Sequence, residues 1–251
     1  MVRAVMGSAG IRLVGMGFTF LVGIQLARGL GAEGLGVYSI AMSILALLTV
    51  FVQFGMPQLL TREVAVAHVN EDWGKIRGIL RWSNQVVLVT YPIATLFVAL
   101  WVWTSDPELN KPISTTLLAG LAVIPLIALS NIRDASLRGL QHIMKGQISE
   151  NILRPALLSI LLFSAPLMLA SSLTPTSAMA LSAVSAAASL LFSINMLRIT
   201  RPTKASLAPI KIERHTWRLS ATQIALSEGL RTLQGHLILS LIHISEPTRP
   251  Y

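Results

Sequence analysis

The sequence predicts an all-α protein, a polytopic bundle of membrane helices with six spans, a truncated seventh and a cytoplasmic N-terminus. Of the 251 residues, 53% are hydrophobic and only 12% are charged, whereas a soluble domain typically has about 25% charged residues. Apolar runs recur along the chain, and each is about 20 residues long, enough to cross a hydrocarbon layer of about 30 Å. The basic residues gather in alternate connections between these runs, a pattern that sets orientation in a membrane.

The first predicted unit is a transmembrane hairpin made of two apolar runs, residues 7–27 and 37–54. The residues between them, 28–36, include four glycines, and we expect them to form a turn because glycine supplies turn conformations at no steric cost. Three of these glycines match the pattern GxGxxG of dinucleotide-binding proteins. That pattern needs a preceding β-strand, so we interpret it here as a turn between two membrane helices.

Four further apolar runs predict spans three to six. The third run ends in Trp101 and Trp103 and begins at Trp82, and such amphipathic rings favour the membrane interface. The sixth run is rich in Ala and Ser, which permit close packing of membrane helices. These runs cover residues 82–103, 113–132, 155–172 and 177–197, and a seventh begins near Leu219.

The connections between the runs predict the orientation. The N-terminal segment and the connections 58–81, 133–154 and 198–218 hold 16 of the Lys and Arg residues, whereas the alternate connections hold only Arg28 and Lys111. The positive-inside rule therefore places the N-terminus in the cytoplasm. The net charge of +9 is explained by these basic connections, so we do not expect a nucleic-acid partner.

Two acid–base pairs at i,i+4 spacing lie in the connection 133–154, namely Asp134 with Arg138 and Glu150 with Arg154. Such pairs stabilise a helix, and we expect this one to lie along the membrane surface. The chain has no Cys, and its five His are scattered. We therefore expect no disulfide, no metal site and no cofactor.

The chain divides into four predicted parts. Its last residues read LSLIHISEPTRPY and resemble the translation of a sequencing adapter, and their prolines stop a helix that has barely begun. We therefore expect a natural chain cut inside its seventh span. The parts are a six-helix transmembrane bundle (1–198), a cytoplasmic basic linker (199–218), the truncated start of a second bundle (219–238) and an artefact tail (239–251).

Three stretches carry a resemblance to a known family: LARGLGAEGLGVYSIAMSILALL (26–48), GMPQLLTREVA (55–65) and ASLRGLQHIMKGQISENILRP (135–155). Together they resemble the N-terminal half of polysaccharide flippases, the Wzx/RfbX-type proteins of the multidrug/oligosaccharidyl-lipid/polysaccharide exporter superfamily. The resemblance implies two six-helix bundles around a central cavity. It also implies transport, without catalysis, of an undecaprenyl-diphosphate-linked oligosaccharide from the inner to the outer leaflet of the bacterial inner membrane. Membrane lipids and the polysaccharide polymerase machinery are the implied partners.

A diphosphate link needs cationic side chains that face the bundle interior, and Arg suits it because the planar guanidinium donates hydrogen bonds in pairs. Arg28, Arg62 and Arg138 are the candidate substrate-binding residues. Each has an alternative as a basic anchor at the interface, or for Arg138 as the partner of Asp134. Because i,i+1 neighbours do not face each other on a helix, we expect Arg62 not to pair with Glu63.

Glu228 is the candidate ion-coupling residue, since a carboxylate at membrane depth indicates function by default. The alternative is a neutralising pair with Arg231 three residues later. A competing function is a drug or cation antiporter of the same superfamily, which needs acidic residues inside the bundle. Spans one to six show no Asp or Glu at the predicted membrane depth, which favours an anionic substrate. A non-transporting scaffold and an enzyme of polysaccharide assembly are further alternatives.

Overall fold

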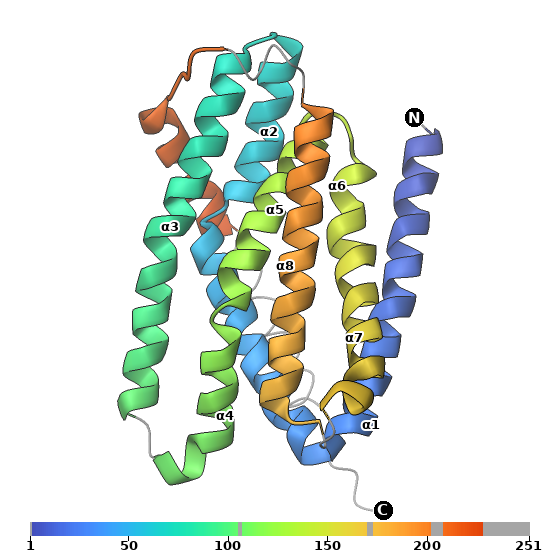
Figure 1. Cartoon of the computed structure of the whole chain (residues 1–251). Helices are drawn as coiled ribbons and strands as arrows, with labels where there is room; N and C mark the ends of the chain where they lie inside the picture. The colour runs from blue at the N-terminus through green and yellow to red at the C-terminus, as the bar shows by residue number, and fades with distance from the viewer. Residues whose placement is uncertain (1, 105–106, 170–172, 202–207, 228–251) are drawn as a thin grey trace, which may run out of the picture.

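The computed structural model describes residues 2–104, 107–169, 173–201 and 208–227 (Figure 1). Every regular element in these ranges is a helix, which confirms the all-α prediction. Five helical segments are long and apolar enough to cross a membrane, by length and composition: Met6–Gln53, Trp73–Thr104, Lys111–Gly139, Lys145–Ala165 and Pro175–Thr200.

The predicted hairpin lies within one long element, α1 (Val2–Gln53), which is interrupted at Gly31. Figure 1 shows the blue ribbon of α1 running to one end of the molecule and turning back toward α2. Gly31 has φ 68° and ψ −177°, a backbone conformation that only glycine adopts without strain. The predicted nine-residue turn is therefore much shorter than expected, because the residues on both sides of Gly31 are helical.

The connection 58–81, predicted as a polar loop, is largely helical. Helix α2 (Met56–Val69) follows Gly55, and α3 (Trp73–Thr104) begins nine residues before the predicted third span. Pro57 lies in the first turn of α2, where its fixed φ favours the helix and no amide donor is lost. Trp82, predicted at the membrane interface, is buried instead, and its ring lies 5.7 Å from that of Trp217.

The fourth predicted span consists of two helices, α4 (Pro107–Gly120) and α5 (Val123–Gly139). Helix α5 continues seven residues beyond the predicted end of the span at Ile132. The surface helix expected from Asp134 and Arg138 is therefore wrong, because both residues belong to α5 and Asp134 is fully buried.

The fifth and sixth spans follow as a nearly continuous rod and a single helix. The rod consists of α6 (Lys145–Ile148), the π-helix η1 (Ser149–Leu153) and α7 (Arg154–Leu169). Helix α8 (Pro175–Thr200) begins with a capping box in which Thr174 and Ser177 satisfy each other's backbone amides, which fixes the start of the helix.

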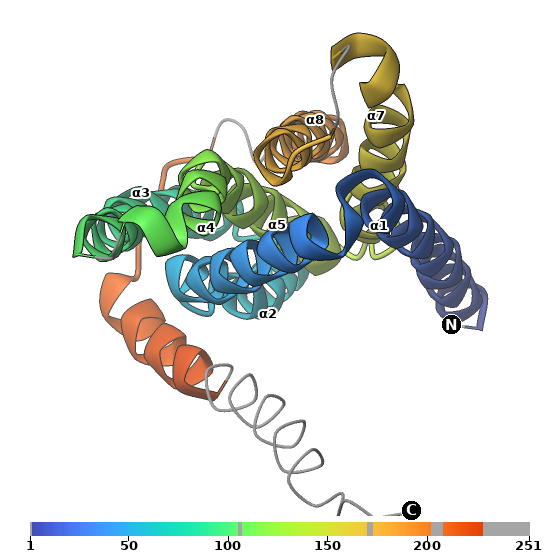
Figure 2. The ribbon, with the colours of Figure 1, turned by 90° about the horizontal axis from the view of Figure 1, so that it is seen from below.

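The helices pack with α5 and α8 at the centre. Figure 1 shows α3 and α4 on one side of this pair, and α7 with the first leg of α1 on the other; Figure 2 shows the same order from below. The first leg of α1 diverges from the rest toward the N-terminus (Figure 2). This leg nevertheless packs closely against the fifth span, since Ser8 donates a hydrogen bond to Gln147 Oε1 at 2.7 Å and Gly15 lies against the Asn151 backbone.

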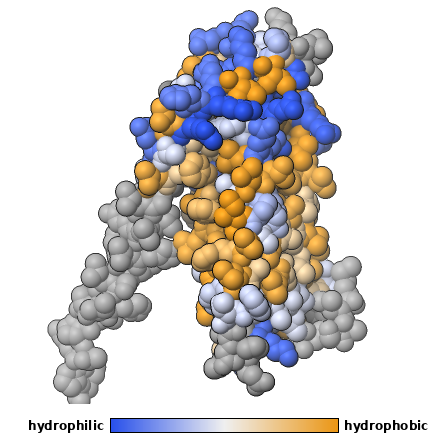
Figure 3. All heavy atoms as spheres, turned by 90° about the vertical axis from the view of Figure 1, so that its left-hand side faces the viewer, coloured by the Kyte–Doolittle hydropathy of each residue, from blue (hydrophilic) through white to orange (hydrophobic). Residues whose placement is uncertain are grey.

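The surface has the pattern of a membrane protein. Figure 3 shows hydrophilic side chains gathered at the end that holds α2 and the start of α3, with a hydrophobic belt beyond them. We call this the hydrophilic end. Large apolar side chains are widely exposed in the belt, among them Phe20, Leu88, Leu96 and Phe163. Lipid rather than water is the natural solvent of such a surface.

The segment after α8 returns to the hydrophilic end and lies against α3. The Lys211 amide donates to the Gly74 carbonyl at 3.1 Å, and residues 214–227 are helical. The division of the chain into bundle, linker and second bundle stays a prediction. Glu228 and the expected tail lie outside the described residues.

Candidate functional site

A cavity of about 840 Å³ lies between the first leg of α1 and the π-helical part of the fifth span. Its size is within the range of small-molecule sites, about 300–1,000 Å³. Three charged side chains open into it, Arg12 from α1 and Glu150 and Arg154 from η1 and α7. The other lining residues are Gly15, Met16, Thr19, Phe20, Gly23, Ile24, Ala27 and Asn151.

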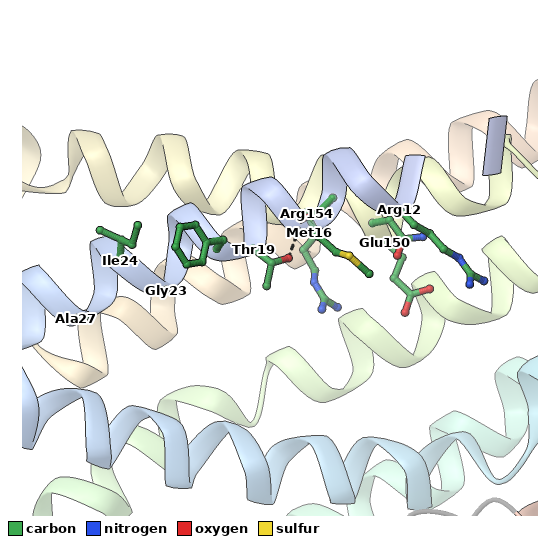
Figure 4. Close-up of a pocket in the computed structure, with 11 residues that line it drawn as sticks. Arg12, Met16, Thr19, Gly23, Ile24, Ala27, Glu150 and Arg154 are labelled. Atoms are coloured by element: carbon green, nitrogen blue, oxygen red, sulfur yellow. Dashed lines mark hydrogen bonds between the residues drawn. The ribbon is translucent and has the colours of Figure 1, made fainter. Parts of the chain in front are cut away.

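The charged groups face one common space. Figure 4 shows the Arg12, Glu150 and Arg154 side chains pointing from two neighbouring helices to the same side of the cavity. Two guanidinium groups and one carboxylate leave the site with a net positive charge. All three residues belong to candidate spanning segments, where charged side chains mark ligand or ion pathways.

The local fold explains how Glu150 reaches this position. Residues Ser149–Leu153 form one π-helical turn. Because a π-helical turn is wider than an α-helical turn, it changes the direction in which the side chains of this turn and of the residues after it project. Short π-helical turns of this kind occur frequently at functional sites. The predicted surface helix with a Glu150–Arg154 pair is not confirmed, because the described residues show no ion pair between these two side chains and both belong to a candidate spanning segment. Both side chains line the open cavity, and Glu150 is exposed.

Gly15 brings the two walls of the cavity together. A Cβ at this position would lie 2.9 Å from the Asn151 carbonyl carbon and still closer to the carbonyl oxygen. A Cβ at Gly17 or Gly23 would meet nothing within 4 Å. Glycine is therefore required at Gly15 for close approach, whereas Gly23 leaves open space in the cavity.

A second cavity, of about 430 Å³, shares Thr19, Gly23, Glu150 and Arg154 with the first. It extends between the two legs of α1 toward α5 and α8, where Tyr38 and Ser182 share a buried hydrogen bond of 2.9 Å. The two cavities together form a polar interior that borders four of the spanning segments.

One face of α8 continues this polar interior as a buried row of hydroxyl groups. The row consists of Ser182, Ser185, Ser189 and Ser193, which follow helical spacing. Ser193 donates to Asp134 Oδ1 at 2.7 Å, and Asp134 Oδ2 has no hydrogen-bond partner among the described residues. Asp134 and Glu150 both belong to candidate spanning helices, but they lie outside the predicted spans 113–132 and 155–172, so the expectation that spans one to six carry no acid at membrane depth stays a prediction.

The three arginines predicted to bind substrate are not brought together. Arg28 is exposed near the reversal at Gly31, whereas Arg62 on α2 and Arg138 at the end of α5 lie at the hydrophilic end. None of the three lines either of the two cavities. Arg138 donates to the Gly146 carbonyl at 3.3 Å. Their role in substrate binding stays a prediction.

Arg62 is engaged by its neighbour. Its Nη2 lies 3.0 Å from Glu63 Oε1, so the expectation that these two residues do not pair is wrong. Glu63 also pairs with Lys75 at 3.1 Å, and Lys75 with Glu213 at 3.0 Å. Burial by itself would raise the pKa of Glu63, but hydrogen bonds from Lys75 and Arg62 outweigh it and lower the pKa. This network ties α2, α3 and the segment after α8 together.

Arg12 and Arg154 are the residues that sequence reasoning missed as site residues. It counted both among the basic residues that orient the chain. One signal was available, because Arg12 lies inside the first apolar run and a charge within a span indicates function. Among the described residues, no three His, Cys, Asp or Glu side chains lie close enough together to hold a metal ion.

Parts of the sequence are similar to known proteins, and this similarity identifies the family of the chain. The chain is 29% identical over 150 residues to Stage V sporulation protein B of Bacillus subtilis (strain 168), a match that covers 56% of this chain. The same match covers only 28% of that relative's length. No solved structure matches the chain. The profile of a family described as "Polysaccharide biosynthesis protein" matches residues 2–242. The chain therefore belongs to this polysaccharide biosynthesis and export family and is a multi-pass protein of the bacterial inner membrane.

Proposed function

We propose that this chain forms the N-terminal helix bundle of a flippase that moves an undecaprenyl-diphosphate-linked oligosaccharide from the inner to the outer leaflet. The observation that carries the proposal is the open cavity that Arg12 and Arg154 line between two candidate membrane helices, in a chain of the polysaccharide biosynthesis family. The transported molecule would supply surface polysaccharide synthesis, and the chain acts as a transporter rather than an enzyme.

The chemistry of such a substrate matches the cavity. Moving a charged and hydroxylated head group through hydrocarbon without partners is very costly. Arginine lowers this cost because its planar guanidinium donates paired hydrogen bonds to phosphate oxygens. Glu150 beside them reduces the net charge, which keeps the diphosphate from being held too tightly to leave.

The first leg of α1 would give the substrate a route from lipid. The first leg of α1 diverges from its neighbours (Figure 2), and Gly23 leaves open space on its inner face. Movement of this leg, with Gly31 as the pivot, would open the cavity sideways to the membrane. Alternating access would follow if a second bundle rocks against this one.

Topology and partners belong to the same proposal. The predicted six spans, with the two legs of α1 as separate spans, and the excess of Lys and Arg at the hydrophilic end support a cytoplasmic N-terminus. Membrane lipids and the polysaccharide polymerase machinery are the proposed partners. Arg28, Arg62 and Arg138 remain candidates for substrate contact, and Glu228 for ion coupling.

One alternative has an observation in its favour. Asp134 places a buried carboxyl group inside the bundle and Glu150 places a second one at the cavity, as a drug or cation antiporter of the same superfamily requires. Against it, the two arginines in the cavity repel a cationic substrate. A strain that expresses this protein would gain resistance to cationic drugs under this alternative and would export polysaccharide under the flippase proposal.

The test is complementation of polysaccharide export in a strain that lacks its own flippase. Arg12→Gln and Arg154→Gln should each reduce export about tenfold or more, because each removes charge-assisted hydrogen bonds worth about 1.5–3 kcal/mol. The matched control is Arg81→Gln, which removes an exposed arginine from α3 outside the cavity. Full export by both cavity variants would overturn the proposed site, and assaying Arg28→Ala, Arg62→Ala and Arg138→Ala alongside tests the sequence-based candidates.

A further inference from the structure

A separate basic cavity of about 300 Å³ lies between α3, α5 and α8. It is near the hydrophilic end, because α8 ends there and α3 begins there. It shares no lining residue with the two cavities of the proposed substrate site. Its lining consists of Leu80, Asn84, Arg133, Ile194, Leu197, Arg198 and Arg201.

Three of the seven lining side chains are arginines, and none is a carboxylate. Arg133 is held in place by Asn84, since its Nη1 donates to Asn84 Oδ1 at 2.8 Å. The neighbouring Asp134 forms no ion pair with Arg133 among the described residues, and its Oδ1 accepts a hydrogen bond from Ser193 instead. Neither Arg133 nor Arg198 takes part in an ion pair with another described residue. The cavity is therefore a concentration of positive charge.

Partial burial of Arg201 adds to the unfavourable concentration of positive charge in this cavity. Arg201 lies beyond the last turn of α8 and is partly buried, and this burial, together with the charge of Arg77, lowers the pKa of its guanidinium. Like charges gathered at low dielectric repel each other strongly. An anion in the cavity would remove that repulsion and accept the hydrogen bonds that several guanidinium groups offer.

Apolar surface continues from the cavity toward the hydrophobic belt. Leu88 lies one helical turn beyond Asn84 on α3 and is 73% exposed. Leu191 lies two turns before Arg198 on α8 and is 67% exposed. Residues spaced in this way share a helix face, so both leucines lie on the belt side of the cavity.

We propose that this cavity binds the phosphate of an anionic phospholipid, with the acyl chains lying over Leu88 and Leu191. Arg133 and Arg198 hold the phosphate from two helices, so the bound lipid links α5 to α8. A phospholipid is favoured over free inorganic phosphate as the ligand, because the cavity lies at the boundary between basic and apolar surface. Basic pockets between membrane helices on the cytoplasmic side are suited to lipid head groups.

The test is binding of phosphatidylglycerol to the purified full chain in detergent, measured by native mass spectrometry. Phosphatidylcholine with the same acyl chains serves as the zwitterionic comparison. Phosphatidylglycerol should be retained preferentially. Arg198→Gln and Arg133→Gln should each weaken its binding about fivefold or more, since each removes charged hydrogen bonds to the phosphate. Arg81→Gln, which removes an exposed arginine from the same region of α3, should leave binding unchanged.

Arg198 is exposed, so Arg198→Gln should fold as the wild type does, and an unchanged unfolding midpoint would verify this. Wild-type binding by that variant, or equal retention of the two lipids, would overturn the proposal. Displacement of the lipid by inorganic phosphate in moderate excess would identify a free-anion site and overturn it as well. Arg12→Gln, in the substrate cavity, should not change phosphatidylglycerol binding. If Arg12→Gln abolished phosphatidylglycerol binding, the lipid would lie in the substrate cavity. That result would contradict the assignment, whatever the export assay shows.

Discussion

Replacing Gly15 by alanine should disrupt the contact that closes the proposed substrate cavity. The added Cβ would lie 2.9 Å from the Asn151 carbonyl carbon and 3.2 Å from the Asn151 Cβ, whereas ordinary contact begins at 3.4 Å. Two backbones must therefore separate by about 0.5 Å or more. Overpacking of this kind costs about 1–3 kcal/mol, and the shift moves the π-helix that carries Glu150.

Gly17→Ala is the matched control, because it makes the same change on the same leg of α1 and meets nothing within 4 Å. Alanine in a helix is favoured over glycine by about 0.5–1 kcal/mol, so this control should be neutral or stabilising. The assay is thermal unfolding of both purified variants, together with polysaccharide export. Gly15→Ala should lower the unfolding midpoint by several degrees, at about 2–4 °C for each kcal/mol, and should reduce export. Equal midpoints and equal export for the two variants would refute the reasoning.

Two further predictions concern carboxyl groups. Glu63 has a lowered pKa, so its contribution to stability should be present at neutral pH and be lost as the pH falls below about 4.5. Glu63→Gln should therefore be less stable than the wild type at pH 7 and approach it in acid, whereas the exposed Glu33→Gln should match the wild type throughout; a pH-independent difference for Glu63→Gln would contradict this. Asp134→Asn should keep wild-type stability or exceed it, because the amide still accepts from Ser193 and no charge is buried. Asp134→Ala should lose about 1–3 kcal/mol in denaturant unfolding, because it removes the acceptor of the 2.7 Å hydrogen bond from Ser193 and leaves space in a fully buried cluster, and equal losses in both variants would show that the carboxyl charge is essential.

Most of the fold could be predicted because the length of each apolar run is read directly from the sequence. The runs near 82–103, 155–172 and 177–197 each lie mainly within a spanning segment of the structure. The errors occur at the ends, since charged residues such as Lys75 and Arg138 continue helices that project beyond the belt. Hydropathy indicates where a helix enters lipid and not where its hydrogen bonding ends.

The site was less predictable for a reason of geometry. Arg12 and Arg154 are more than a hundred residues apart in sequence, and tertiary packing brings their helices together, including the contact of Gly15 with Asn151 and the hydrogen bond from Ser8 to Gln147. The π-helical turn Ser149–Leu153, which carries Glu150, was not among the features predicted from the sequence. Charge counting assigned both arginines to orientation because it does not distinguish a side chain that faces a cavity from one that faces water.

The central claim is that the lipid-linked diphosphate enters the cavity of Arg12, Glu150 and Arg154. The most direct measurement is photo-crosslinking in membranes that contain the lipid-linked oligosaccharide. A photoreactive residue would replace either Thr19, which lines both cavities, or Leu21, which lines neither and is 47% exposed. We expect capture of the oligosaccharide at Thr19 and not at Leu21, and loss of the Thr19 product in the Arg12→Gln background. Equal capture at the two positions, or capture at Thr19 that is unaffected by Arg12→Gln, would contradict it.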